Sequence, residues 1–195
     1  MTNIIKKDPV DMLYKSKKTV FSLKDLSLYW KIENQNYLKT KTRRLVKSGR
    51  LYFIRRGFYA LDKDYDRWEL ANKMITPSYV GLYTILTSEG TNFQYDSRIY
   101  CASRQSRTIY VGKQGYVYKK LSDKALLNPI GLKLDGAKTV ATKERAIMDT
   151  IYLMPDFYFD KLINVDWEMC YEIAKIYGNK KMNARLKQLK EDYAE

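Results

Sequence analysis

The order of hydrophobic and polar residues between positions 21 and 61 predicts two helices followed by a β-hairpin. The first helix begins at Ser22, whose hydroxyl can cap the helix while Asp25, three residues later, bonds back to the cap. Leu26 and Trp30 lie four residues apart, so this helix can bury one face. We interpret the stretch as a helix-turn-helix followed by a two-stranded wing, around which the rest of the chain is organised.

A second helix is predicted from Gln35 to Ser48, and Gly49 is placed to end it. Its apolar and polar positions separate onto opposite sides at the helical repeat. The inward set is Leu38, Thr42, Leu45 and Val46. The outward set is Asn36, Lys39, Thr40, Arg43, Arg44 and Lys47. A recognition helix needs such long donors on its outer face to reach phosphates and base edges in the major groove of DNA.

Residues 51–61 are rich in aromatic and β-branched side chains on both sides of Arg55, Arg56 and Gly57, which predicts a hairpin. Gly57 can adopt the positive φ that the turn needs. Two arginines at the tip would face a phosphate backbone or enter a minor groove. A second interpretation stays open, in which a solvated basic helix and an ordinary hairpin belong to some other small domain.

Another helix is predicted over residues 8–17, with Asp8 as its cap and Pro9 in its first turn. It completes an N-terminal winged helix-turn-helix domain of three helices and a two-stranded wing, residues 1–61. The polar, acidic stretch 62–66 is the expected boundary, and residues 62–195 form the second domain. The predicted fold class of the whole chain is therefore α+β.

The second domain is predicted to be α/β, with a small antiparallel sheet and a terminal helical hairpin. Its predicted helices cover residues 68–75, 76–89, 142–154, 166–177 and 180–193. Its predicted strands cover residues 98–102, 108–111 and 115–121, and residues 128–139 are expected to form a loop. Arg145 and Asp149 lie four residues apart on one helix, and their spacing alone indicates a surface ion pair worth roughly 0.3 kcal/mol.

The distribution of charge sharpens this picture. The chain of 195 residues carries a net charge of +14, and residues 1–61 hold 15 of its 36 Lys and Arg residues but only 4 of its 22 Asp and Glu residues. The net charge is therefore +11 in this first segment and +3 in the remainder. The excess lies in the predicted DNA-binding domain, as expected for a protein that binds a polyanion.

Other residue types limit the classes of function. The chain has no histidine, which excludes Ser-His-Asp and Cys-His nucleophile systems and zinc sites ligated by histidine. Cys101 and Cys170 are expected to be buried thiols in a reducing cytoplasm. No apolar run approaches the roughly 20 residues of a membrane span, and the N-terminus lacks the pattern of a signal peptide. We expect a cytoplasmic protein with no membrane partner.

Two further functions stay open. A metal-dependent nuclease needs converging carboxylates, and the nearest candidates are Asp135, Glu144 and Asp149, of which the last two point different ways on one helix. A ligand-sensing regulator would instead bind a small molecule in the second domain. We favour a protein without enzymatic activity and expect no catalytic residue, no metal ligand and no cofactor.

Three segments carry a resemblance that covers nearly the whole chain. They are residues 43–61, 77–82 and 141–149, the last with Arg145 and Asp149 on one helix. The chain resembles the AbiEi-type antitoxins of bacterial type IV (abortive infection) toxin–antitoxin systems, which act in phage defence. The resemblance implies a winged helix that binds inverted repeats in its own promoter and represses the operon. It also implies a second domain that counteracts a partner nucleotidyltransferase-like toxin without a stable complex.

The residues expected to contact double-stranded operator DNA combine the outward helix face, the hairpin tip and their neighbours. They are Ser22, Lys24, Asn36, Lys39, Thr40, Arg43, Arg44, Lys47, Arg50, Arg55 and Arg56. In the second domain the resemblance draws attention to Arg145 and Asp149. Whether this pair maintains the fold or acts in antitoxicity stays open.

Overall fold

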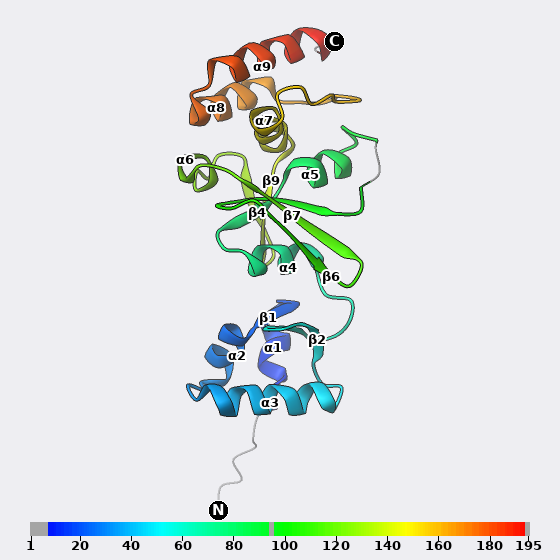
Figure 1. Cartoon of the computed structure of the whole chain (residues 1–195), viewed down its shortest axis with the longest axis vertical. Coiled ribbons are helices and arrows are strands. Elements are labelled where there is room, and N and C mark those ends of the chain that lie inside the picture. The colour runs from blue at the N-terminus through cyan, green and yellow to red at the C-terminus, as the bar shows by residue number, and fades with distance from the viewer. Residues whose placement is uncertain (1–7, 94–95, 194–195) are drawn as a thin grey trace, which may run out of the picture. The chain divides into compact units, whose positions relative to one another are not determined.

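The computed structural model describes residues 8–93 and 96–193, which form a mixed α+β protein, as the sequence predicts. The chain divides into two compact units, residues 1–73 and 74–195. Each unit has its own β-sheet (Figure 1). The predicted boundary after Leu61 falls inside the first unit, which continues to Lys73.

The first unit has a small sheet and a set of helices. Its elements in chain order are α1 (Asp11–Lys15), β1 (Val20–Ser22), α2 (Leu23–Trp30), α3 (Gln35–Lys47), β2 (Tyr52–Arg55), β3 (Phe58–Ala60) and α4 (Arg67–Met74), whose last residue begins the second unit. The strands pair antiparallel in the order β1-β3-β2. The sheet therefore has three strands where only a two-stranded hairpin was predicted. A strand as short as β1 shows no alternation that would reveal it in the sequence.

The core of the first unit lies between α3 and the other elements. Leu13, Phe21, Leu26 and Leu38 are fully buried and belong to one apolar cluster. Figure 1 shows α1, α2 and the strands on the same side of α3. The packing therefore covers one side of this helix, and no other described element of the unit covers its opposite side.

The second unit is built around a six-stranded sheet. Its strands are β4 (Ser78–Val80), β5 (Ile99–Ser103), β6 (Arg107–Val111), β7 (Gln114–Lys120), β8 (Leu132–Asp135) and β9 (Lys138–Ala141). They lie in the order β6-β7-β5-β4-β9-β8, with β4 parallel to β9 and β5 parallel to β7. The prediction of a small antiparallel sheet is wrong, because the sheet is larger than expected and mixed.

Two errors in the predicted elements explain this difference. Residues 76–89 were predicted as one helix, but residues 78–80 form β4, which hydrogen-bonds to β5 and β9 in the sheet. Residues 128–139 were predicted as a loop, but half of them form β8 and the beginning of β9, an antiparallel hairpin. A short apolar run such as that of β4 does not distinguish a strand from a helix, and its partners β5 and β9 are distant in sequence. Most residues of β8 are exposed, so that strand lacks an apolar run.

The helices of the second unit agree with the predicted elements better than its strands do. They are α5 (Leu82–Ser88), α6 (Asp123–Leu126), α7 (Lys143–Leu153), α8 (Trp167–Tyr177) and α9 (Lys180–Tyr193), of which α6 was not predicted. α7 begins as predicted, because the Thr142 hydroxyl accepts a hydrogen bond from the Arg145 backbone N–H at 3.3 Å. It packs against both α5 and α8, and α8 with α9 forms the predicted terminal helical hairpin (Figure 1).

Candidate nucleic-acid interface

α2 begins with the capping box that the sequence predicts. The Asp25 N–H donates to the Ser22 hydroxyl at 3.1 Å, and the Ser22 N–H donates to the Asp25 carboxylate at 2.8 Å. The helix ends at Lys31, which has a φ of +52°. After a short turn, the Asn34 side chain caps α3 by accepting hydrogen bonds from two backbone N–H groups, each at 3.0 Å. Both ends of the connection between α2 and α3 are therefore fixed by local hydrogen bonds.

α3 has the two-sided character that its sequence predicts. Leu38, Thr42 and Leu45 are buried. The exposed residues include all six of the predicted outward set, Asn36, Lys39, Thr40, Arg43, Arg44 and Lys47. The helix ends in a Schellman motif, because Gly49 has a φ of +70° and the Arg50 N–H donates to the Leu45 carbonyl at 2.9 Å.

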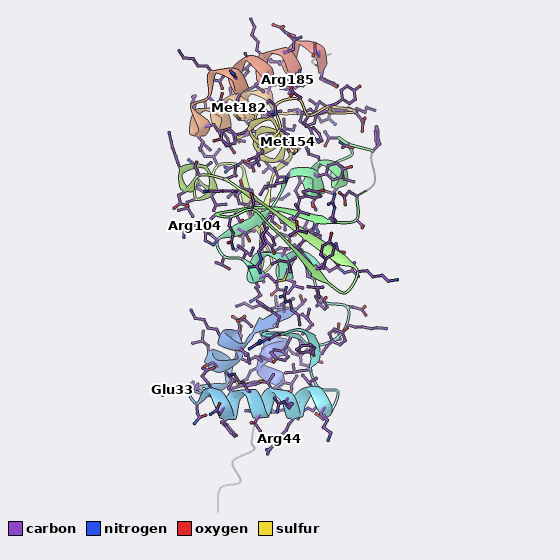
Figure 2. The ribbon with its side chains drawn as sticks, viewed as in Figure 1. Glu33, Arg44, Arg104, Met154, Met182 and Arg185 are labelled. Atoms are coloured by element: carbon purple, nitrogen blue, oxygen red, sulfur yellow. The ribbon has the colours of Figure 1, made fainter. Side chains whose placement is uncertain are left out.

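The exposed face of α3 is cationic along its length. No Asp or Glu occurs among its residues, Gln35–Lys47. Figure 2 shows Arg44 projecting away from the body of the unit, with Glu33 before the start of the helix. Lys41 differs from the other lysines, because its ammonium lies 4.7 Å from the centre of the Trp30 ring and burial lowers its pKa. The remaining cations lie on the outer face, where they can meet a polyanion.

The β2–β3 hairpin adds aromatic and basic groups beside this face. Gly57 in its turn has a φ of +87°, as predicted, and Arg56 beside it is exposed. Phe53 is exposed and packs edge-on against Tyr59, with ring centres 5.9 Å apart. Burial raises the pKa of Tyr59, and the nearby guanidinium of Arg43 opposes that shift. The guanidinium of Arg43 on α3 thus lies within electrostatic range of Tyr59 on the hairpin.

Not every predicted DNA contact is equally available. Lys24 is exposed, whereas the Ser22 hydroxyl is occupied by Asp25 in the capping box. Arg50 forms an ion pair with Asp8 at the start of the unit. No local pattern indicates this pair, because the two residues are far apart in sequence. Arg55 is half-buried while Arg56 is exposed.

The second candidate pair, Arg145 and Asp149, lies inside the second unit. The sequence indicated a surface pair, but both side chains are 0% exposed, with Arg145 Nε donating to Asp149 Oδ1 at 3.1 Å. The Tyr79 hydroxyl donates to the other carboxylate oxygen at 2.6 Å, and the Tyr177 hydroxyl donates to Oδ1. The predicted spacing is right, and the predicted exposure is wrong because β4 and α8 enclose the pair.

The guanidinium of Arg145 also donates hydrogen bonds to backbone carbonyl groups. It donates to the carbonyl oxygens of Ala125 at 2.5 Å, Ile130 at 2.7 Å and Asn128 at 3.3 Å. Burial alone would lower the pKa of Arg145, but the carboxylate of Asp149 and the neighbouring tyrosines raise it above its ordinary value. Arg145 therefore stays cationic, and its donors connect α7 to α6 and to the loop that precedes β8.

Burial raises the pKa of Asp149, and Arg145, Tyr177 and Tyr79 oppose that shift. The three donors around it suit a carboxylate, which only accepts hydrogen bonds. The tyrosine partners were missed by sequence reasoning, because Tyr79 and Tyr177 lie in other elements, at separations that carry no pattern. Arg145, Asp149 and Tyr79 are buried, so the hydrogen bonds of this cluster connect α7 to β4 and α8 inside the second unit.

The carboxylates considered for a nuclease do not assemble. Within the described ranges, no group of three or more Cys, Asp or Glu side chains is arranged to hold a metal ion. Asp149 faces Arg145 inside the unit, while Asp135 is exposed on β8. Cys101 and Cys170 are free and buried, as predicted, and burial raises the pKa of both thiols.

Comparison with known proteins assigns the chain to no family. The chain matches no family model, and a search of curated proteins finds no match either. Within the part of the chain that the structure describes, no helix is both long enough and apolar enough to cross a membrane.

Proposed function

We propose that the protein binds double-stranded DNA through the first unit, acting as a winged helix-turn-helix. In this proposal α3 is the recognition helix and the β2–β3 hairpin is the wing. The observation that carries the proposal is the exposed face of α3, which presents Lys39, Arg43, Arg44 and Lys47 without an acidic residue in the helix. Such a face suits contacts to phosphates and to the acceptor-rich edge of guanine.

We further propose that the protein is an AbiEi-type antitoxin. It would repress its own operon through inverted repeats in the promoter, and its second unit would counteract a partner nucleotidyltransferase-like toxin without a stable complex. The support is the resemblance carried by residues 43–61, 77–82 and 141–149. These segments supply much of the basic surface of the first unit and the residues Tyr79, Arg145 and Asp149 of the buried cluster.

DNA binding is tested with the purified full-length protein on its own upstream DNA and on a scrambled duplex, across about 50 to 200 mM salt. We expect selective binding to the upstream DNA. Arg43→Ala or Arg44→Ala should each weaken it by about 1–3 kcal/mol if the side chain reads bases. Lys181→Ala is the matched control, since Lys181 is an exposed cation on α9 in the second unit.

The outcomes separate the candidate functions. Unchanged affinity in both single variants and in the double variant would reject α3 as the recognition helix. Weak binding to both duplexes with the same salt dependence would mean that the first unit binds DNA without sequence selectivity. A metal-dependent cleavage assay on the same duplexes would then test the nuclease alternative.

Antitoxicity is tested separately from repression. The chain is expressed with a nucleotidyltransferase-like toxin and a reporter under the upstream promoter. We expect Arg43→Ala/Arg44→Ala to release the reporter while growth rescue continues, because the substitutions lie in the first unit. Loss of rescue at an equal protein level would contradict the assignment of antitoxicity to the second unit.

A further inference from the structure

The first unit has a groove between α1 and α2. Two adjacent hollows of about 490 and 310 Å³ lie there and share Met12 and Tyr29 in their walls. The described lining residues come from α1, α2 and the segments that adjoin them, and none of them belongs to α3. Figure 1 likewise draws α1 and α2 on one side of α3. The groove is therefore separate from the surface proposed to bind DNA.

Large apolar side chains are exposed along this groove. Met12 on α1 is 40% exposed, and Leu28 on α2 is 69% exposed. Leu28 follows the buried Leu26 by two residues, a rotation of about 200° on a helix, so it faces away from the core. A single exposed leucine is ordinary, but adjoining apolar side chains with a polar rim are typical of an interaction site.

Cations surround the apolar floor of the groove. They are Lys15, Lys18 and Lys31. The described lining also includes two acidic residues, Asp11 and Asp25. The charge of Asp25 is already compensated, because the Lys73 ammonium donates to its carboxylate at 2.8 Å. The groove therefore presents three lysines against Asp11, and this balance favours an acidic partner.

The same charges disfavour the two occupants that the chain itself could supply. A second copy would bring an identical set of lysines to the contact, and like charges that face each other repel. Residues 1–7 contain Lys6 and Lys7 and no acidic residue. An amphipathic helix with carboxylates beside its apolar side matches both the floor and the rim, and helices commonly bind grooves through such an apolar side.

We propose that the groove between α1 and α2 binds an acidic amphipathic helix of a partner protein. Apolar side chains of that helix enter the two hollows around Met12 and Tyr29, and its carboxylates pair with the three lysines. The first unit is then a protein-binding module in addition to its proposed role on DNA. The inference does not depend on DNA binding, because α3 contributes no residue to the groove's described lining.

The probe is a designed helical peptide with leucines along one side and glutamates beside them, labelled for fluorescence anisotropy with the full-length protein. A second peptide keeps the leucines and has lysine in place of glutamate. We expect the wild type to bind the acidic peptide about tenfold more tightly than the basic one. Met12→Ser/Leu28→Ser should weaken binding of the acidic peptide about tenfold. The matched control is Leu127→Ser/Leu134→Ser, which removes two exposed leucines from the second unit.

Charge reversal tests the cationic rim. Lys15→Glu/Lys31→Glu should exchange the preference, so that the basic peptide binds more tightly than the acidic one. Lys133→Glu/Lys181→Glu makes the same change in net charge at exposed lysines of the second unit and should keep the wild-type preference. Arg43→Ala/Arg44→Ala should bind the acidic peptide as the wild type does, which separates this result from the outcome of the DNA-binding test.

Three results would overturn the proposal. The first is equal affinity of the wild type for the two peptides, or unchanged affinity in Met12→Ser/Leu28→Ser. The second is a dimer in sedimentation that Met12→Ser/Leu28→Ser dissociates, because the occupant would then be a second copy. The third is tighter binding of the acidic peptide by Ile4→Ser/Ile5→Ser, because residues 1–7 would then compete for the groove.

Discussion

The contact between Arg145 and Asp149 can be predicted from their spacing, whereas the buried environment of the pair cannot. The pair with Asp149 follows from four-residue spacing on a helix, but the enclosing tyrosines come from β4 and α8. Breaking a buried ion pair leaves an unpaired charge in the interior, which costs far more than losing a surface pair. The role of such residues depends on which distant segments meet them.

Replacing Arg145 with alanine should therefore destabilise the second unit by about 3–5 kcal/mol. The substitution removes the cation that opposes the burial-raised pKa of Asp149, and it removes the donor of three backbone carbonyl groups. Urea unfolding followed by circular dichroism measures the effect. The control is Arg104→Ala, which breaks the exposed ion pair with Asp123 and should cost less than about 1 kcal/mol. Equal effects of the two substitutions would mean that the buried cluster contributes no more than a surface pair.

The tyrosines of the same cluster make stability depend on pH above neutrality. Burial, followed by the charge of Asp149, raises the pKa of Tyr177 well above its ordinary value of about 10. A group whose pKa is raised by folding stabilises the fold fully below its unfolded pKa, and this contribution is lost as pH rises through the folded pKa. The free energy of unfolding should thus fall by about 1.4 kcal/mol per pH unit for each such tyrosine above pH 10.

Tyr177→Phe tests this dependence, because phenylalanine keeps the ring and removes the ionising hydroxyl. Between about pH 10 and 11.5 the variant should lose stability less steeply with pH than the wild type. The comparison uses urea unfolding at each pH, and Tyr14→Phe, at an exposed tyrosine, is the control. Parallel curves for Tyr177→Phe and the wild type would reject the assignment.

At the level of elements, local sequence signals predict the ends of helices better than they predict which strands pair with each other. The capping residues Ser22, Asn34 and Thr142 act within three or four residues, so the helix starts that they define are close to those of the structure. β1 and β4 were missed because their partners lie elsewhere in the chain, and β8 was missed because most of its residues are exposed, although its partner β9 follows it directly. Gly49 and Gly57 adopt positive φ, as their places in the pattern require. Their positions could be predicted, whereas sheet order could not.

Two glycines near β8 allow a matched test of how the second unit packs. Gly131 and Gly136 have φ values of +71° and +59°. A Cβ on Gly131 would lie 2.8 Å from Arg145 Cβ and 3.0 Å from Ile173 Cδ1, whereas one on Gly136 would meet nothing within 4 Å. Gly136→Ala should cost about 1 kcal/mol from backbone strain, and Gly131→Ala about 2–4 kcal/mol because it also overpacks the interior.

Thermal unfolding of the two variants gives the comparison directly. Because the backbone strain is similar, the difference between them reports the close approach of residue 131 to α7 and α8. If Gly136→Ala proved as damaging as Gly131→Ala, the close packing at residue 131 would have to be abandoned.

For the whole molecule, the division into two units has a direct consequence for stability. Each unit has its own sheet, and the Arg145 cluster lies entirely in the second. Arg145→Met should accelerate hydrogen exchange across residues 79–177 and leave the protection of residues 20–60 unchanged. Its affinity for upstream DNA should also match that of the wild type. Acceleration of equal size in both units would show that they unfold as one.

The charge asymmetry of the molecule could be predicted completely, because it depends on sequence alone. The net charge of +11 over residues 1–61 needs no structure to be counted. Which cations are available does need one. Lys41 lies over Trp30, and Arg50 pairs with Asp8, although both look equivalent to their neighbours in sequence.

The Arg145 cluster also sets an order of events during synthesis. The carbonyl groups of residues 125, 128 and 130 leave the ribosome before Arg145, their donor, and Tyr177 follows later still. Until α8 has emerged, the nascent second unit holds an incompletely enclosed charge pair. A chain that ends before residue 177 would therefore be unable to complete the interior of the second unit, and a larger unfolded fraction makes a protein more susceptible to proteolysis.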